Sequence, residues 1–390
     1  MFMAKAKCRE KTSEGKLGEA SVDTEFYFQW HITERCNRRC RHCYHVSYDS
    51  RGELSDDALL GVADKLVAAL KAWGRRGSIG LTGGEPWMRR DAVFGLLDRF
   101  GASDTIDHVD LMTNGTLLSV ADCEQLVVRS LPLRRIQFSL EGASPAVHDA
   151  IRGIGSFEET IAAIRRSKQC GLTVAVMMTL SRQNMHEIVL LLDRLVDLGV
   201  DVFAIDRFIP EGQASSHTDW LLSASELKHC FETVHRWGIG HRQPRVLMYR
   251  PLFCLIDPES PYVGAMCSAG INALTILHDG AIYPCRRLPL LLGNVMTDSL
   301  FEVFYESPIL WKVREPENLG GHCASCEYLP VCRGCRAMAL AVTGDWLAQD
   351  PSAGYEKIPE AACRTPARKS RGDTGVLPIP APHRRTIRNQ

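Results

Sequence analysis

The feature that most limits the fold is a repeated alternation of short apolar runs with longer amphipathic stretches. Such runs are typical of buried strands, and apolar residues at helical spacing indicate the helices between them. The expected strands are Phe26–Thr33, Ser78–Gly83, His108–Asn114, Arg135–Leu140, Thr173–Leu180 and Val200–Ile209, and the expected helices include Ser55–Ala72, Asp91–Phe100, Ser119–Arg129, Ser156–Cys170 and Asn184–Leu198. Six strand-then-helix units predict an α/β fold, a parallel sheet with outer helices that forms a partial (β/α)6 TIM-like barrel.

Local signals at the helix ends support this pattern. Ser55 is placed to cap the first helix, with Asp56 and Asp57 in its first turn to suit the helix dipole. Gly171 and Gly199 each stand between a helix and the next strand, which is where a glycine ends a helix best.

Polar loops follow several of the expected strands. They contain a group of cysteines after the first strand, then Gly83–Pro86, Thr113–Gly115 and Ser139–Gly142. Because the carboxyl ends of barrel strands meet at one mouth, we expect these four loops to converge there.

The cysteines after the first strand are Cys36, Cys40 and Cys43, in a C-x3-C-x2-C spacing. Three thiolates are one too few for a closed tetrahedral zinc site. They suit a cubane iron–sulfur cluster in which three irons are ligated and the fourth is open to a small molecule. The alternative is a zinc knuckle in which His42 or His45 supplies the fourth ligand.

Composition sets the class of protein and its compartment. The chain has 390 residues and a formal net charge of +0, which argues against general attraction to nucleic acid or to an anionic membrane. No apolar run approaches the roughly 20 residues that span a bilayer, and no secretory signal is visible. We therefore expect a cytoplasmic protein, in which the clustered cysteines bind metal or do catalysis rather than form disulfides. Of the 15 cysteines, Cys8, Cys123, Cys170 and Cys230 stand outside the clusters.

The chain divides into four regions. An N-terminal extension of residues 1–25 precedes the barrel, residues 26–240, and a smaller cysteine-rich region, residues 241–365, follows it. Short regions of this kind are often held together by metal. Residues 366–390 are basic and rich in proline, as expected for a disordered tail.

The sequence CNRRCRHCY at residues 36–44, followed by Gly83–Pro86, resembles the radical S-adenosylmethionine (radical SAM) superfamily. The later cysteines resemble its SPASM branch: Cys267, Gly280 and Cys285 fit the first part of that pattern, and Cys323, Cys326 and Cys332 fit the second. Cys335 departs from the pattern, because two residues rather than three separate it from Cys332.

The resemblance implies an enzyme, a radical SAM oxidoreductase or maturase. Its reduced 4Fe–4S cluster would cleave S-adenosylmethionine, and the 5′-deoxyadenosyl radical would abstract hydrogen from a substrate. The protein would supply orientation and exclude water. The residues that match cofactor contacts of the family are Gly83, Gly84, Glu85 and Pro86 for the methionine amino group, Ser139 for the ribose, Arg152 for the methionine carboxylate, His42 and Tyr44 near the adenine, and Asn114 as an ordering residue.

The resemblance also implies two auxiliary 4Fe–4S clusters whose ligands interleave along the chain. Cys267, Cys285 and Cys335 would hold the first, with Cys254 as the upstream candidate for the fourth ligand. Cys323, Cys326, Cys332 and Cys363 would hold the second. Without Cys254, the first auxiliary cluster would have an open iron that substrate could bind. Two zinc sites made from the same thiolates are the alternative.

Two substrate classes compete. The stretch from Gly334 to Pro351 resembles peptide maturases of the pyrroloquinoline quinone and mycofactocin type, which favours oxidative modification of a peptide or small protein. The alternative is a tetrapyrrole, as in the heme and heme d1 branch, which carries a similar stretch. Arg286 and Arg287 would then serve its carboxylates. Arg207 and Glu211 could also reach substrate. No general base is assigned, because Arg286 stands where sulfatase-maturating enzymes have an aspartate.

The partners implied are an external electron donor such as flavodoxin or ferredoxin and, for a peptide substrate, a separate peptide-recognition protein. A third hypothesis is a non-enzymatic electron-transfer protein, which would not release 5′-deoxyadenosine. The SAM-contact motifs around the first three cysteines argue against it.

Overall fold

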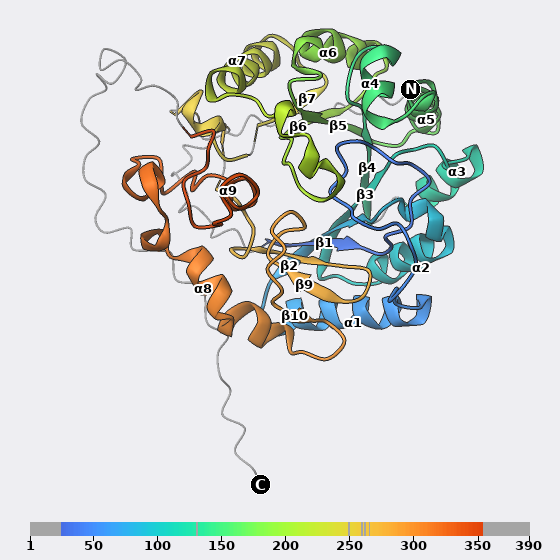
Figure 1. The fold of residues 1–390 in the computed structure, drawn as a ribbon. Helices are drawn as coiled ribbons and strands as arrows, with labels where there is room; N and C mark the ends of the chain where they lie inside the picture. The colour runs from blue at the N-terminus through green and yellow to red at the C-terminus, as the bar shows by residue number, and fades with distance from the viewer. Residues whose placement is uncertain are drawn as a thin grey trace, which may run out of the picture.

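A computed structural model describes residues 25–129, 132–248, 250–258, 260, 263–264 and 266–353. One sheet of ten strands runs through it, in the order β10-β9-β8-β1-β2-β3-β4-β5-β6-β7 (Figure 1). The strands are β1 Glu25–His31, β2 Arg76–Thr82, β3 Ile106–Thr113, β4 Leu133–Ser139, β5 Val174–Leu180, β6 Val202–Arg207, β7 Arg245–Leu247, β8 Ala273–Ile276, β9 Ala281–Tyr283 and β10 Gly293–Asn294. Strands β1 to β7 pair in parallel with their neighbours, as does β8 with β1.

Helices surround the sheet on the outside (Figure 1). They are α1 Asp56–Ala72, α2 Arg90–Gly101, α3 Val120–Val128, α4 Pro145–Arg152, α5 Ser156–Gln169, α6 Ile188–Asp197, α7 Ala224–Gly240, α8 Pro308–Arg314 and α9 Arg336–Thr343. All six expected strands and all five expected helices are present, and their ends differ from the expectation by a few residues. The α/β partial barrel is therefore confirmed.

The expected helix ends are also confirmed. The Ser55 hydroxyl accepts a hydrogen bond from the backbone N–H of Ala58 at 3.2 Å, which satisfies one of the unpaired N–H groups of the first turn of α1. Gly171 and Gly199 have φ of 87° and 65°, the left-handed conformation that lets the chain leave a helix and start the next strand.

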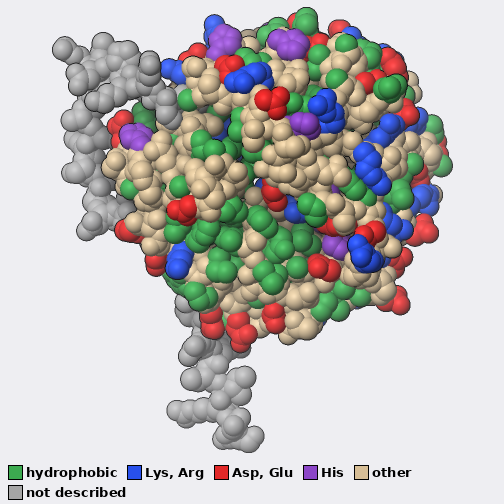
Figure 2. Space-filling model, in the orientation of Figure 1, with side chains coloured by type: hydrophobic (Ala, Val, Ile, Leu, Met, Phe, Trp, Pro, Cys, Tyr) green, Lys and Arg blue, Asp and Glu red, His purple; other side chains and the backbone are tan. Residues whose placement is uncertain are grey.

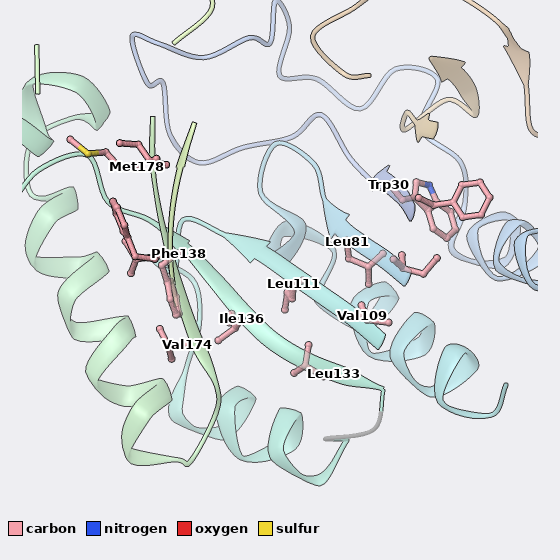
Figure 3. Packing of buried hydrophobic residues seen from close by; sticks show 14 of the residues in the cluster. Trp30, Leu81, Val109, Leu111, Leu133, Ile136, Phe138, Val174 and Met178 are labelled. Atoms are coloured by element: carbon pink, nitrogen blue, oxygen red, sulfur yellow. The ribbon is translucent and has the colours of Figure 1, made fainter. Parts of the chain in front are cut away.

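The strands of the barrel have two different faces. In β1, Phe26, Phe28 and Trp30 are fully buried against the outer helices, whereas Tyr27 and Gln29 point to the inside and line a cavity. The same alternation runs through the neighbouring strands, and Figure 3 shows the outward set: Leu81, Leu111, Ile136, Phe138 and Val174. The outward side chains form the hydrophobic core, and the inward side chains line the cavity.

The sheet does not end at residue 240, where we expected the barrel to stop. Strand β7 adds to β6, and β8 returns to pair with β1, so the cysteine-rich region extends the same sheet on both sides. Helices α8 and α9, coloured orange and red, lie to one side of it (Figure 1). The N-terminal extension except Glu25, Cys363 and the proline-rich tail lie outside the described residues.

Acidic and basic side chains are interspersed on the face seen in Figure 2, in keeping with the formal net charge of +0. Among the described residues, no helix is long and apolar enough to cross a membrane.

Candidate functional site

A cavity of about 700 Å³ opens inside the sheet, at the carboxyl ends of the strands. Its walls come from the first cysteine loop, from the loops after β2, β3 and β4, and from the cysteine-rich region. The four polar loops expected at one mouth all contribute to it or pack beside it. A cavity of this size lies in the range found for small-molecule and cofactor sites.

Cys36, Cys40 and Cys43 all line this cavity. Each sulfur receives an N–H group: Cys36 from the backbone of Arg38 at 3.4 Å, Cys43 from the backbone of His45 at 3.5 Å, and Cys40 from Arg152 Nη1 at 3.8 Å. Such donors stabilise sulfur that carries negative charge.

No three His, Cys, Asp or Glu side chains among the described residues converge on a point that could hold a single metal ion. A cubane cluster attaches each thiolate to a different iron, and the three separate thiols fit it.

Arg152 is held by a buried carboxylate rather than left free. Its Nε and Nη2 donate to Glu141 Oε1 at 2.8 and 2.7 Å, and Glu141 is fully buried at the end of β4. His42 Nε2 lies 3.2 Å from the same oxygen. Although burial opposes ionisation, Arg152 and His42 lower the pKa of Glu141 to about 2. Arg152 thus has a protein partner already and presents its Nη1 to Cys40.

Removing this carboxylate should be costly. Glu141→Gln leaves the Arg152 charge buried without its partner, so we expect the free energy of unfolding to fall by about 3–5 kcal/mol at neutral pH. A carboxyl with a depressed pKa stabilises the folded state above its unfolded pKa, and this contribution disappears as pH falls from about 4.5 to about 2. The free energies of unfolding of wild type and variant, measured with urea, should therefore approach each other over that pH range.

Glu226→Gln is the matched control, because Glu226 also has a pKa of about 2 but pairs with Arg182 at the surface. Glu226→Gln should lower the free energy of unfolding by no more than about 1 kcal/mol. Equal effects of the two substitutions would refute the stabilising role of Glu141.

The glycines of the Gly83–Pro86 turn are required by the chain itself. A Cβ on Gly83 would lie 2.6 Å from the Thr33 carbonyl oxygen, and one on Gly84 would lie 2.4 Å from that of Arg35. The N–H of Gly84 donates to Thr33 and that of Glu85 to Arg35, both at 2.8 Å. The turn therefore ties β2 to the segment that leads into the cysteine loop.

Only part of this turn faces the cavity. Gly83 and Gly84 line it, whereas Glu85 and Pro86 are buried beside it. The Glu85 carboxylate accepts hydrogen bonds from Thr113 Oγ1 at 2.6 Å and from the Asn114 N–H at 2.7 Å. Glu85 thus links the ends of β2 and β3, and Gly83 and Gly84 are the residues of this turn that face the cavity.

The other expected cofactor contacts are brought together. Ser139, His42, Tyr44 and Asn114 all line the cavity. The Asn114 amide donates to Asn37 at 2.9 Å and lies 4.0 Å from the Cys36 sulfur, so it helps to fix the cysteine loop.

A second set of thiols, Cys267, Cys285 and Cys335, lines another part of the same cavity. The Cys335 N–H donates to Asp350 Oδ2 at 2.7 Å, and Asp350 accepts two further bonds from Arg207, at 3.1 and 2.7 Å. Asp350 is fully buried. The end of β6 is thereby fixed to the segment that carries Cys335.

Cys254 does not line the cavity that Cys267, Cys285 and Cys335 line. It is buried among apolar side chains of the core. Its expected role as the fourth ligand beside those three thiols stays a prediction. Cys363, an expected member of the second set, lies outside the described residues.

The arginines expected near substrate differ in how they are held. Arg287 donates to Asp206 Oδ2 at 2.5 Å, and Arg207 is engaged by Asp350, so both are structural. Arg286 lies over the Tyr44 ring at 4.9 Å, and its nearest acidic atoms belong to Glu34 at 3.7 Å and Glu211 at 3.9 Å. Its Nε is buried and has no hydrogen-bond partner among the described residues.

Sequence reasoning assigned no role to three acids: Glu141, Asp206 and Asp350. Glu141 and Asp350 are fully buried, and Asp206 is partly exposed. Glu141 and Asp206 lie at strand ends and Asp350 lies in a polar stretch, and each forms an ion pair with an arginine in the cavity wall. Neither kind of position identifies the arginine with which the acid pairs.

Comparisons with known proteins agree with this geometry. The family model of the radical SAM superfamily matches residues 30–195, and that of the iron–sulfur cluster-binding SPASM domain matches residues 267–336. The chain is 30% identical to the AdoMet-dependent heme synthase of Methanosarcina barkeri, over 84% of this chain and 95% of that protein. It is 29% identical to the mycofactocin maturase MftC of Mycolicibacterium smegmatis, over 84% and 81%.

The fold is also similar to a solved structure, Streptococcus suis SuiB bound to the precursor peptide SuiA. The TM-score is 0.67 at 16% identity, and the match covers 84% of this chain and 75% of SuiB. At this identity the likeness concerns the fold alone.

Proposed function

This chain belongs to the radical SAM superfamily and carries a SPASM domain, and from that premise we propose that it oxidatively modifies a peptide or small protein. It is an enzyme whose cofactors are S-adenosylmethionine and 4Fe–4S clusters. When bound, these cofactors supply a radical that abstracts hydrogen.

The first cluster is assigned to Cys36, Cys40 and Cys43, whose sulfurs each receive an N–H group in the cavity. S-adenosylmethionine would lie between this loop and the glycines of the β2 turn, with Ser139 on the ribose side. Tyr44, His42 and Asn114 would line the remaining wall. Arg152 is already paired with Glu141. Its positive charge would stabilise the Cys40 sulfur, and it would also meet the methionine carboxylate.

The peptide assignment rests on the ion pairs that arginines in the cavity wall already form. Six arginines line the cavity. Four of them form ion pairs with acidic residues of the chain itself: Arg38, Arg152, Arg207 and Arg287. The other two are Arg250 and Arg286. A tetrapyrrole brings several carboxylates, and burying them requires cations that are not already neutralised. A peptide segment is largely neutral and makes no such demand.

Arg286 is the candidate for a direct substrate contact. Its Nε lacks a hydrogen-bond partner, and its charge is partly offset by Glu34 and Glu211. A neutral oxygen, such as a peptide carbonyl, would satisfy this buried donor without adding a third negative charge beside Glu34 and Glu211. Arg286 also directly follows Cys285 and stacks on Tyr44, so such a contact would lie between the two sets of thiols.

A second candidate is supported by a different observation. The relative at 30% identity is named as a heme synthase, and the match covers 95% of its length. Under this alternative the enzyme would modify a tetrapyrrole side chain. Arg286 would then meet a carboxylate, and substrate would have to displace Glu34 or Glu211 from it.

One experiment separates the two. Anaerobically reconstituted, reduced enzyme is incubated with S-adenosylmethionine and either a short peptide encoded next to its gene or a siroheme-derived tetrapyrrole. We expect 5′-deoxyadenosine together with a mass change in the peptide, and an unchanged tetrapyrrole. Loss of carbon dioxide from the tetrapyrrole with no change in the peptide would overturn the proposal.

A further inference from the structure

The outer surface of the first cysteine loop, residues 35–48, carries charge that the chain itself does not neutralise. Arg39 and Arg41 are exposed on either side of Cys40, which is buried. Neither forms an ion pair with an acidic side chain of the described residues, unlike Arg35 and Arg38 on the same loop. Two uncompensated positive charges therefore face solvent beside a residue of the first cluster site.

Aromatic rings hold both of these arginines in place. The Arg41 guanidinium lies over the Trp220 ring at 4.9 Å, and the Arg41 N–H donates to the Ile151 carbonyl oxygen at 2.9 Å. The Arg39 guanidinium lies over the Tyr48 ring at 4.0 Å, and its Nη1 donates to two carbonyl oxygens of the loop at 2.7 and 2.8 Å. A partner that binds charges fixed in this way has less side-chain entropy to remove.

A turn beside the loop presents an apolar side chain to solvent. Ile154 is 95% exposed and stands between Gly153 and Gly155, whose φ angles are 106° and 81°. The Gly155 N–H donates to Asp149 Oδ2 at 2.8 Å, so the turn is fixed although it is exposed. The loop itself leaves Val46 76% exposed. Exposed apolar side chains together with arginines are typical of a protein–protein contact.

This surface lies close to the first cluster site. Cys40 is 9% exposed and its sulfur receives Arg152 Nη1 inside the molecule, whereas its chain neighbours Arg39 and Arg41 are exposed. The loop is dark blue in Figure 1, and Figure 2 shows several basic side chains on the part of this face where it runs. Because electron transfer slows steeply with distance, an electron carrier gains by docking where a cluster ligand is one residue away.

We propose that Arg39, Arg41, Val46 and Ile154 form a docking face for an acidic one-electron carrier protein. The reduced carrier would pass one electron to the first cluster and become oxidised, with no bond formed or broken and no proton transferred. Carboxylates of the carrier would meet the two arginines, and electron-transfer contacts are commonly small enough for a face of this kind. The inference goes beyond the proposed function, since it holds for either class of substrate.

Binding is tested by isothermal titration calorimetry of the reconstituted enzyme with oxidised flavodoxin, an acidic flavoprotein that carries single electrons. We expect Arg41→Glu to raise the Kd about tenfold, because it replaces an attraction by a repulsion at the contact. Arg236→Glu is the matched control, since Arg236 is exposed on α7, which lies away from the loop in Figure 1. The control should keep the Kd within about twofold of the wild-type value. Equal Kd values for Arg41→Glu and wild type, or no binding by wild type, would overturn the proposal.

A second variant, Ile154→Asp, tests the turn. The variant should fold as wild type does, because Ile154 is 95% exposed and has almost no buried contact to lose. An acidic side chain there should repel the carboxylates of flavodoxin and raise the Kd severalfold. An unchanged Kd would overturn the assignment of this turn to the docking face.

The choice of reductant separates docking from cofactor binding. Release of 5′-deoxyadenosine is measured with subsaturating reduced flavodoxin and, separately, with dithionite, a small ion that needs no docking face. We expect Arg41→Glu to slow release about tenfold with flavodoxin and to leave the rate with dithionite unchanged. Equal slowing with both reductants would show that Arg41 acts on the cofactor site, and would overturn the proposal.

These measurements need no peptide or tetrapyrrole, and the substrate assay can be run with dithionite. An unchanged peptide would therefore leave the docking face standing, and failure of the flavodoxin experiments would leave the peptide proposal standing.

Discussion

Cys40→Ala is expected to abolish cleavage of S-adenosylmethionine while the barrel stays folded. Cys40 is 9% exposed, lines the cavity and receives the Nη1 group of Arg152. Without it the cluster site keeps only two thiolates, which cannot hold a cubane in place. Release of 5′-deoxyadenosine from reduced protein, measured by chromatography, should fall to the background of a reaction without enzyme.

Cys123→Ala is the matched control, because Cys123 is also a buried cysteine but lies on α3, against Ser167. Its rate of 5′-deoxyadenosine release should equal that of wild type. Cleavage retained in Cys40→Ala would show that the cluster that binds the cofactor lies elsewhere.

Asp350→Ala is expected to release the segment that carries Cys335 from the end of β6. Asp350 is fully buried and accepts hydrogen bonds from Arg207 and from the N–H groups of Cys335 and Ser352. Its removal leaves the Arg207 charge buried and unpaired, which should lower the free energy of unfolding by about 3–5 kcal/mol. Denaturant unfolding measures this, and iron content should fall because Cys335 loses its fixed position.

Asp345→Ala serves as the control for this change. Asp345 lies five residues earlier, is exposed, and accepts a hydrogen bond from Leu347 N–H at 2.9 Å. We expect its free energy of unfolding to fall by no more than about 1 kcal/mol and its iron content to stay unchanged. If Asp350→Ala unfolds at the same denaturant concentration as wild type, Asp350 does not fasten the Cys335 segment to β6.

The barrel could be predicted because its signals are local. Alternation in β1 places Phe26 and Phe28 outward and Tyr27 inward, and a run of seven residues is long enough to show that period. Strands β7 to β10 have two to four residues each, too few for any periodicity. Their place in the sheet is set by pairing with β1 and β6, which sequence pattern does not reveal.

The first cysteine group could be predicted from spacing, because its three thiols lie within eight residues of the chain. The convergence of Cys267, Cys285 and Cys335 on one cavity could not be read from spacing alone, because these residues lie far apart in the sequence. Likewise, Arg207 and Asp350 are 143 residues apart. Such ion pairs form only once the fold has brought their strands and loops together.

The central claim is that the cluster at Cys36, Cys40 and Cys43 binds S-adenosylmethionine through an open iron. Electron–nuclear double resonance of the reduced protein tests it, with the cofactor carrying 15N in the amino group and 17O in the carboxylate of its methionine part. The account predicts hyperfine coupling from both labels in wild type and from neither in the variant that lacks all three cysteines. Coupling that persists in that variant, or is absent from iron-replete wild type, would contradict it.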